Sequence, residues 1–139
     1  MLFRLSGDVV LAGFGLGPRV ESPPIQAVKT AFEVVRKTRE LGREQERRDE
    51  PSLQVGIAVV TGPVVLGVLG RRRWRRWSVL GTSVGVVERL EELALSDEVL
   101  VDGPTFQALA KDVAEQFQPS PRMLRGESIQ TPAYSWRGR

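Results

Sequence analysis

A few charged side chains in this sequence could take part in chemistry that involves metal ions or anions. Asp8 follows Gly7 in a turn-forming pair, and a carboxylate on a tight turn is a hard oxygen ligand suited to Mg²⁺ or Mn²⁺. Arg89 carries a planar guanidinium that can bind phosphate oxygens through two parallel hydrogen bonds. Each has an ordinary alternative, since Gly7-Asp8 can serve only as a turn and Arg89 can pair with Glu92 on a helix surface.

The composition restricts the chemistry further. The 139 residues include no cysteine and no histidine, which excludes disulfides, thiolate metal sites, Ser-His-Asp hydrolases and His-ligated zinc enzymes. Acid–base chemistry near neutral pH is left to carboxylates, lysine, substrate phosphates or metal-bound water. With 41% apolar and 27% charged residues, we expect residues 1–139 to form a single soluble domain.

The sequence gives no sign of membrane insertion or secretion. No apolar run reaches the ~20 residues of a membrane-spanning helix. The start, MLFRLSGDVV, lacks the charged segment followed by an apolar one that marks a signal peptide. We therefore expect a cytoplasmic protein with no membrane segment.

The elements that must position these residues begin with a hairpin and a long helix. Residues 3–14 are mainly apolar around Gly7-Asp8, which predicts two short strands with Asp8 at the tip. Ser22 before two prolines marks a helix start, and we expect a helix over roughly Pro24–Leu41. Its apolar residues recur at helical spacing: Ile25, Val28, Phe32 and Val35. The charged residues 42–52 are expected to form a solvated tail and a loop.

Strands and helices alternate through the rest of the chain. The β-rich runs Leu53–Val60 and Val64–Leu69 flank Thr61-Gly62-Pro63, so we expect a second hairpin. The other expected elements are a strand at Trp77–Leu80, a helix capped by Thr82 or Ser83 with the stripe Val84, Val87, Leu90 and Leu93 or Ala94, a strand at Glu98–Val101, a helix at Pro104–Asp112, and strands near Met123 and Tyr134 around an Arg125-Gly126 turn. This order predicts an α+β fold with a mostly antiparallel sheet and helices packed on it.

One stretch of the chain resembles a known family. Residues 56–93 read GIAVVTGPVVLGVLG, then RRRWRRW, then SVLGTSVGVVERLEEL. Their order and spacing resemble the catalytic domain of class III nucleotidyl cyclases, which convert ATP or GTP into a cyclic nucleotide, and the resemblance extends from about Arg4 to Trp136. It implies a ferredoxin-like (βαββαβ-derived) nucleotidyl cyclase fold, Mg²⁺ or Mn²⁺ as cofactor, and active sites between two domains. We therefore expect a homodimer, or a heterodimer with another cyclase-type domain.

The resemblance also implies roles for five residues. Asp8 corresponds to the second metal-binding aspartate of the family. Arg4 lies where adenylate cyclases carry a base-reading lysine, and Ser78 lies at the position of its partner. Arg89 corresponds to the arginine that stabilises charge on the transferring phosphoryl group. Arg125, in Leu124-Arg125-Gly126, corresponds to the lysine that neutralises the nucleotide phosphates.

The preferred base follows from the hydrogen bonds that Arg4 and Ser78 can make. Donation from Arg4 to adenine N1 and acceptance by Ser78 from the adenine amine favour ATP. An arginine can also bind guanine O6 and N7, so GTP remains the less favoured alternative. A surface arginine and an ordinary strand serine are the other interpretation.

Two departures from the family bear on activity. Gly85 stands in GTSVGVVERLE where the family's GDTVNLAARLE has the asparagine that helps to fix the substrate ribose. The family's first strand, its helices and its first metal aspartate precede the matched part, so we expect the domain to be N-terminally incomplete. Losing one preorganised transition-state contact costs roughly 10²- to 10³-fold in rate. We expect a domain related to cyclic AMP synthesis and signalling that is impaired or inactive alone, or a non-catalytic dimerisation or regulatory module.

RRRWRRW, residues 71–77, concentrates much of the positive charge. Five arginines and two tryptophans lie there, in a chain of net charge +3. Such a run can bind nucleic acid through phosphates and stacked bases. Alternatively, Trp74 and Trp77 can pack on the sheet while the arginines stay in water. In the family this stretch lies near the dimer interface, so we expect an interface or surface role rather than nucleic-acid binding.

Overall fold

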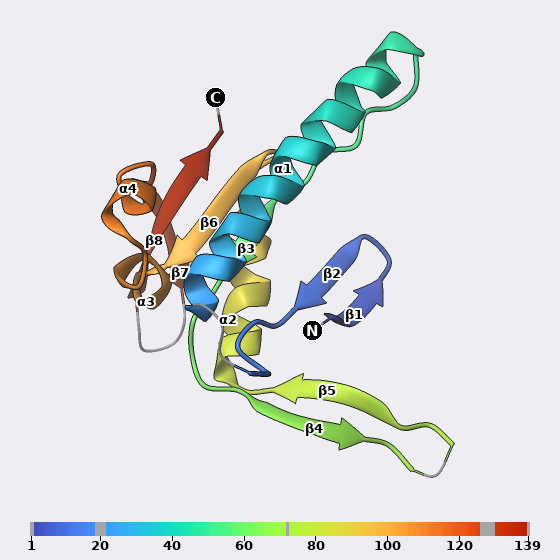
Figure 1. Ribbon diagram of the computed structural model, residues 1–139, viewed down its shortest axis with the longest axis vertical. Coiled ribbons are helices and arrows are strands. Elements are labelled where there is room, and N and C mark those ends of the chain that lie inside the picture. The colour runs from blue at the N-terminus through green and yellow to red at the C-terminus, as the bar shows by residue number, and fades with distance from the viewer. Residues whose placement is uncertain (1, 19–21, 72, 126–129, 139) are drawn as a thin grey trace.

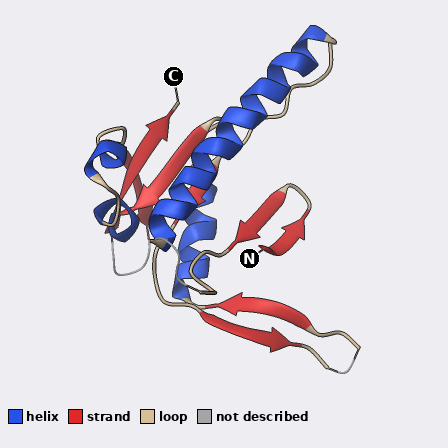
Figure 2. Cartoon of the chain, viewed as in Figure 1, coloured by secondary structure: helices blue, strands red, loops and turns tan. Residues whose placement is uncertain are grey.

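The structure is a computed structural model that describes residues 2–18, 22–71, 73–125 and 130–138, with the backbone alone for 2–6, 123–125 and 130–131. Figures 1 and 2 show the arrangement of its elements. The strands are β1 (Leu2–Ser6), β2 (Val9–Ala12), β3 (Ile57–Val59), β4 (Val65–Leu69), β5 (Arg76–Leu80), β6 (Glu98–Asp102), β7 (Gln118–Arg125) and β8 (Gln130–Arg137). The helices are α1 (Pro23–Arg47), α2 (Thr82–Glu91), α3 (Gly103–Gln107) and α4 (Lys111–Ala114).

The core is a four-stranded sheet covered by a helix on each face. Its strand order is β3-β6-β8-β7, with β3 parallel to β6 and the other pairs antiparallel. All five residues of β6 are buried. Val99 and Val101 pack with α1, whereas Leu100 between them packs with α2 residues such as Leu90. Since successive strand residues point to opposite faces, α1 and α2 cover opposite sides of this sheet.

Two short hairpins stand beside the main sheet. β1 pairs with β2 around Gly7 and Asp8, as the sequence predicts, and β4 pairs with β5. In Figure 1 the β4–β5 hairpin extends away from the helices, and the β1–β2 hairpin lies between it and the upper half of α1. The described residues therefore form an α+β arrangement in which most strand pairs are antiparallel, with three separate sheets.

The predicted hairpin across Thr61-Gly62-Pro63 is wrong. β3 pairs with β6, about forty residues later, and β4 pairs with β5 instead. The segment between β3 and β4 is a connection that leaves the main sheet. Thr61 holds its start, because its N–H donates to Asp102 Oδ1 at 3.3 Å and its hydroxyl lies 2.8 Å from that of Thr105. A parallel partner so distant in sequence leaves no local signal, whereas two apolar runs around a turn resemble a hairpin.

Helix α1 and the predicted helix Pro104–Asp112 differ from the prediction for local reasons. Helix α1 continues to Arg47 rather than ending near Leu41. Gly42 is buried where the chain returns, and Gln45 Oε1 accepts a hydrogen bond from the Leu53 N–H at 2.9 Å. The returning chain therefore supports the last turns of the helix. The predicted helix Pro104–Asp112 is divided into α3 and α4, because Ala110 has an extended backbone (φ −66°, ψ 151°).

Candidate functional site

Asp8 lies on the tight turn that the sequence predicts. Gly7 before it has a φ of +60°, a conformation that glycine adopts at little cost. The side chain of Asp8 is exposed. In the parts of the chain that the structure describes, no three Asp, Glu, His or Cys side chains cluster so as to hold a metal ion. Within the described residues, Asp8 is therefore not part of a carboxylate cluster that could hold a metal ion.

Arg4 and Ser78 come from two hairpins that contact each other. Arg4 lies in β1 opposite Leu11, and Ser78 lies in β5 opposite Gly67. Strands β1 and β5 are in contact. Ser78 is partly exposed, and its hydroxyl donates to the Arg76 carbonyl at 3.4 Å. A Cβ added at Gly67, the residue opposite Ser78, would meet nothing within 4 Å.

Gly85 and Arg89 share one face of α2. The Arg89 Nε donates to the Gly85 carbonyl at 3.3 Å, and a Cβ added at Gly85 would meet only Arg89 Nη2, at 3.8 Å. Arg89 is exposed, and no ion pair described in this structure joins it to Glu92. Arg89 therefore does not form the surface ion pair with Glu92 that was the alternative interpretation. The guanidinium instead lies over the position where the sequence places a glycine.

The start of α2 is fixed to the connection between β3 and β4. Ser83 Oγ donates to the Pro63 carbonyl at 3.2 Å. The helix follows β5 directly, and the predicted cap at Thr82 or Ser83 is wrong, because the N-cap is Gly81 and no side chain caps the helix. Ser78, Gly85 and Arg89 therefore belong to one continuous strand–turn–helix unit.

Arg125 ends the longest antiparallel pair of the main sheet. It is the last residue of β7, and its backbone pairs with Gln130 in β8. Helix α2 packs against β7, so Arg125 and Arg89 lie on contacting elements. Gly126, the second residue of the predicted turn, lies outside the described residues.

Sequence reasoning missed a buried carboxylate, Glu98, at the start of β6. Glu98 is 0% exposed and pairs with Arg122 and Arg137, while Ser135 Oγ and the Leu95 N–H donate to it. Burial raises its pKa, but the hydrogen bonds from Arg122, Ser135 and Leu95 and the charge of Arg122 outweigh this and lower the pKa to about 2. The only sequence signal was one glutamate before an apolar strand.

The Glu98 cluster is structural rather than catalytic. Arg122 Nη1 also donates to the Leu93 carbonyl at 2.8 Å, just beyond the end of α2. The cluster thus ties together β6, β7, β8 and the segment after α2. Arg122 is about one quarter exposed, and none of the five predicted site residues makes a described contact with Glu98.

A hollow of about 920 Å³ lies elsewhere, between α1 and the C-terminal strand. Phe32 and Trp136 form its apolar part, with ring centroids 4.1 Å apart. Arg36 at its rim pairs with Glu33 and Glu40 on the same helix. The residues that line the hollow include none of the predicted site residues, so it is separate from the candidate site.

The basic segment 71–77 forms the tip of the β4–β5 hairpin. Its tryptophans do not pack on the sheet, and that alternative is wrong: Trp74 is 80% exposed and Trp77 is 58% exposed. The described arginines of the segment are exposed as well. The hairpin is too narrow to bury these side chains, because only two strands form it.

Within the described residues, no helix combines the length and the apolar character needed to cross a membrane.

Comparison with known proteins links the sequence to one family. Residues 5–131 match the family described as Adenylate and Guanylate cyclase catalytic domain. A protein of Mycobacterium tuberculosis and one of Mycobacterium bovis, both described as uncharacterized, are each 29% identical over 113 residues. The match covers 80% of this chain, but the chain spans only about a fifth (20%) of the length of those relatives.

Solved structures show the same fold. The guanylyl cyclase Cya2 matches with a TM-score of 0.80 at 21% identity, covering 98% of this chain and 68% of that one. The guanylate cyclase domain of RhGC from Catenaria anguillulae, in complex with GTP, gives 0.80 at 21%, covering 99% and 72%. The adenylyl cyclase CyaB from P. aeruginosa gives 0.78 at 17%, covering 96% and 69%. The α+β architecture with antiparallel-rich sheets is thus the cyclase fold, and the chain belongs to the adenylate and guanylate cyclase catalytic domain family.

Proposed function

We propose that this chain is one half of a paired cyclase domain that binds ATP and converts little of it to cyclic AMP by itself. The expected low turnover rests on Gly85. Where a side-chain amide is expected to hold the ribose, the helix offers only a backbone carbonyl, which already accepts a hydrogen bond from Arg89.

The nucleotide in this proposal is held by residues from two surfaces. Ser78 is partly exposed and would accept a hydrogen bond from the adenine amine, and Arg4, on a strand in contact with β5, would donate to the ring. Arg89 is exposed and has no carboxylate partner among the described ion pairs, so its charge is available to a phosphate. Arg125 would supply a second positive charge from a contacting element.

Pairing with a second cyclase domain is part of the proposal. The relatives include a dimeric guanylyl cyclase domain from Blastocladiella emersonii, described as non-canonical, which matches with a TM-score of 0.68 at 19% identity. Asp8 lies on an exposed turn, and a divalent cation would need further oxygen ligands from outside the described residues.

The test is a comparison of turnover. The purified chain is assayed for cyclic AMP formation from ATP with Mn²⁺, beside an active class III cyclase domain. We expect the chain to turn over ATP at a rate at least about 100-fold lower than that of the active domain, because the amide contact to the ribose is missing. A rate within about tenfold of the active domain would contradict the proposal.

The matched variants are Gly85→Asn and Gly85→Ala. A Cβ at position 85 meets Arg89 Nη2 at 3.8 Å, an ordinary contact, so there is room for the Cβ that both substitutions add. Assayed with a partner domain that supplies the remaining ligands, Gly85→Asn is expected to raise turnover about tenfold or more. Gly85→Ala adds the same Cβ without the amide, and is expected to leave turnover unchanged.

A second candidate function is a non-catalytic pairing module. It is favoured by the same glycine, because a domain that only pairs has no need of the amide. Adding the chain to an active cyclase domain tests it: association together with a changed rate supports regulation, whereas no association excludes it. ATP binding that depends on Arg89 favours the first candidate over the second.

A further inference from the structure

The hollow between α1 and the end of β8 takes no part in the proposed function. Its volume of about 920 Å³ lies within the roughly 300–1,000 Å³ that is usual for sites that bind small molecules. Residues of α1 between Phe32 and Arg43 line one side of it. The other side is lined by Glu115 and Gln116 after α4, Gln118 of β7, and residues 135–138.

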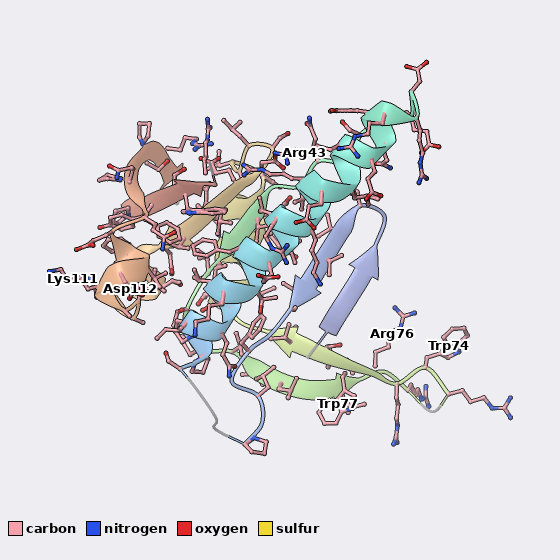
Figure 3. The ribbon with its side chains drawn as sticks, turned by 45° about the horizontal axis from the view of Figure 1, so that its top comes forward. Arg43, Trp74, Arg76, Trp77, Lys111 and Asp112 are labelled. Carbon is pink, nitrogen blue, oxygen red and sulfur yellow. The ribbon has the colours of Figure 1, made fainter. Side chains whose placement is uncertain are left out.

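The hollow lies away from the surfaces that the proposed pairing and nucleotide binding use. Helix α1 covers one face of the main sheet, and α2, which carries Gly85 and Arg89, covers the other. Among the described residues that line the hollow, none belongs to the β1–β2 or the β4–β5 hairpin. Figure 3 shows Arg43 well away from Trp74 and Trp77 on the β4–β5 hairpin. Pairing through that hairpin therefore does not require the hollow.

One wall of the hollow is a fixed aromatic surface. The ring centroids of Phe32 and Trp136 are 4.1 Å apart, and Phe32 also stacks with the buried Phe117 at 5.8 Å. This packing holds the Trp136 ring in place, while the residue remains partly exposed. A ring held in this way offers a flat apolar surface against which an aromatic ligand can stack.

Arg39 lies beside this aromatic wall. A Cβ added at Gly138 would lie 2.6 Å from Trp136 Cη2 and 2.7 Å from Arg39 Nη1, so both atoms border the same point. Arg39 Nε donates to the Asp97 carboxylate at 2.9 Å, and Nη2 donates to the Asp97 carbonyl at 3.4 Å. Among the described hydrogen bonds Nη1 has no acceptor, so an N–H group next to the ring of Trp136 is left for a ligand.

Arg43 adds a positive charge that no described residue compensates. It lies one turn beyond Arg39 on α1, and the described ion pairs and hydrogen bonds give it no partner. Side chains four residues apart on a helix are neighbours, so the guanidinium groups of Arg39 and Arg43 can both reach one anionic group.

The carboxylates that line the hollow already have cationic partners. Glu33 and Glu40 both pair with Arg36, at 2.8 and 2.7 Å, and Glu115 lies 3.8 Å from a lysine of α4. A cationic ligand would therefore find no free carboxylate there, whereas an anion finds a free guanidinium. A single negative charge matches this balance. The triphosphate of ATP does not, because it would bring several negative charges close to three carboxylates.

We propose that this hollow binds a small aromatic carboxylate. The ring of the ligand lies against Trp136, and its carboxylate accepts hydrogen bonds from Arg39 Nη1 and from the Arg43 guanidinium. Guanidinium groups suit this task, because their parallel N–H groups match the two oxygens of a carboxylate. The site does not depend on nucleotide binding or turnover.

The test is binding of naphthalene-2-carboxylate to the full chain, measured by calorimetry. For a ligand of this size we expect a dissociation constant of about 1 mM. Naphthalene-2-carboxamide has the rings without the charge, and acetate has the charge without the rings. Each should bind at least about tenfold more weakly. No binding of the carboxylate, or equal binding of either analogue, would overturn the proposal.

Arg43→Gln tests the contact with the carboxylate. Arg43 is exposed and glutamine is a good helix former, so the fold should be kept while the affinity falls roughly tenfold. Arg47→Gln removes the same charge one turn further along α1, outside the lining of the hollow. This control should bind within about twofold of the wild type. Equal affinities of the two variants would show that Arg43 does not hold the carboxylate.

The indole N–H resonance of Trp136 locates the ligand independently of these variants. The other two tryptophans, Trp74 and Trp77, are exposed on the β4–β5 hairpin, so Trp74→Phe/Trp77→Phe assigns the Trp136 signal. We expect the Trp136 signal to shift during the titration while the signals of Trp74 and Trp77 stay in place. A shift of the hairpin signals alone would place the ligand on the hairpin and refute the site.

Two further measurements separate the hollow from the surfaces proposed above. ATP should not displace naphthalene-2-carboxylate, and Arg89→Ala should bind it as the wild type does. Displacement by ATP, or loss of binding in Arg89→Ala, would put the carboxylate in the nucleotide site instead. Binding should also persist when a partner cyclase domain is added. Its loss on pairing would show that the partner covers the hollow, and this too would contradict the proposal.

Discussion

Arg89 and Glu98 show two uses of charge in one small domain. Glu98 is enclosed by donors and its charge is compensated within the protein. Arg89 is exposed and bonds only to a backbone carbonyl among the described hydrogen bonds, so its charge can serve a ligand. The sequence indicated Arg89 because its motif resembles a family, but Glu98 has no such motif, and its role arises only when β7 and β8 bring Arg122 and Ser135 to it.

The depressed pKa of Glu98 predicts how stability changes with pH. The carboxyl titrates near 4.5 in the unfolded chain and at about 2 in the folded one, so below pH 4.5 the unfolded state binds more protons. Its contribution to stability is full above pH 4.5 and is lost as the pH falls towards 2. Glu98→Gln should flatten the wild-type decline of the unfolding free energy in that window, as measured by urea titration at several pH values.

At neutral pH the same variant is expected to lose about 3 kcal/mol of stability, because Arg122 is left without its buried partner. Glu115→Gln, an exposed glutamate of the segment after α4, is the matched control and should change stability by less than about 0.5 kcal/mol. Ser135→Ala removes one donor only and is the milder variant. An unchanged pH profile in Glu98→Gln would show that this carboxylate is not ionised and paired as described.

At the scale of elements, the sequence predicted what local pattern determines. The start of α1 follows from Ser22 and two prolines, and the β1–β2 turn follows from Gly7-Asp8. The partner of β3 did not follow, because parallel pairing with β6 depends on contacts about forty residues away. The end of α1 also failed, since support from the returning chain at Leu53 is not visible in a helix pattern.

Asp102 is expected to be the most sensitive helix cap. Its carboxylate accepts hydrogen bonds from the Thr105 N–H at 3.0 Å and the Thr61 N–H at 3.3 Å, and the residue is buried. Asp102→Ala should cost about 2 kcal/mol of unfolding free energy, measured by chemical denaturation. Asp112→Ala, an exposed aspartate in the first turn of α4, is the control and should cost less than half as much. Equal losses would show that the cap does not fasten the connection after β3.

Gly70 tests the turn of the β4–β5 hairpin. Its φ of +120° and the nearby Trp74 carbonyl leave no room for a side chain, so Gly70→Ala should cost about 1–3 kcal/mol locally. Amide hydrogen exchange in β4 and β5 should accelerate. Gly67→Ala on the same hairpin meets open space and is the control, with exchange close to the wild type. Protected amides in Gly70→Ala would contradict the described turn.

On the scale of the whole molecule, one closed core carries two projecting hairpins. The core is enclosed by α1 and α2, whereas β1–β2 and β4–β5 form separate two-stranded sheets (Figure 2). The sequence predicted the α+β class and the order of elements because these depend on local apolar patterns. It could not predict how the strands divide into sheets, nor that Trp74 and Trp77 remain exposed, because both depend on which strand lies beside β4.

This arrangement makes the proposed site a surface shared by several elements. Ser78 and Arg89 belong to one strand–turn–helix unit, and Arg4 and Arg125 lie on strands that contact that unit. A ligand that bridges them should stabilise the folded state by mass action, even where turnover is slow.

The most direct test of the account is nucleotide binding measured by calorimetry and thermal unfolding with ATP and Mn²⁺. We predict that ATP binds the wild type and raises its melting temperature by roughly a few degrees at saturating concentration. Arg89→Ala should lose this response, and Arg43→Gln on α1 should keep it. No ATP binding by the wild type, or equal binding by Arg89→Ala, would contradict a nucleotide site at this position of the cyclase fold.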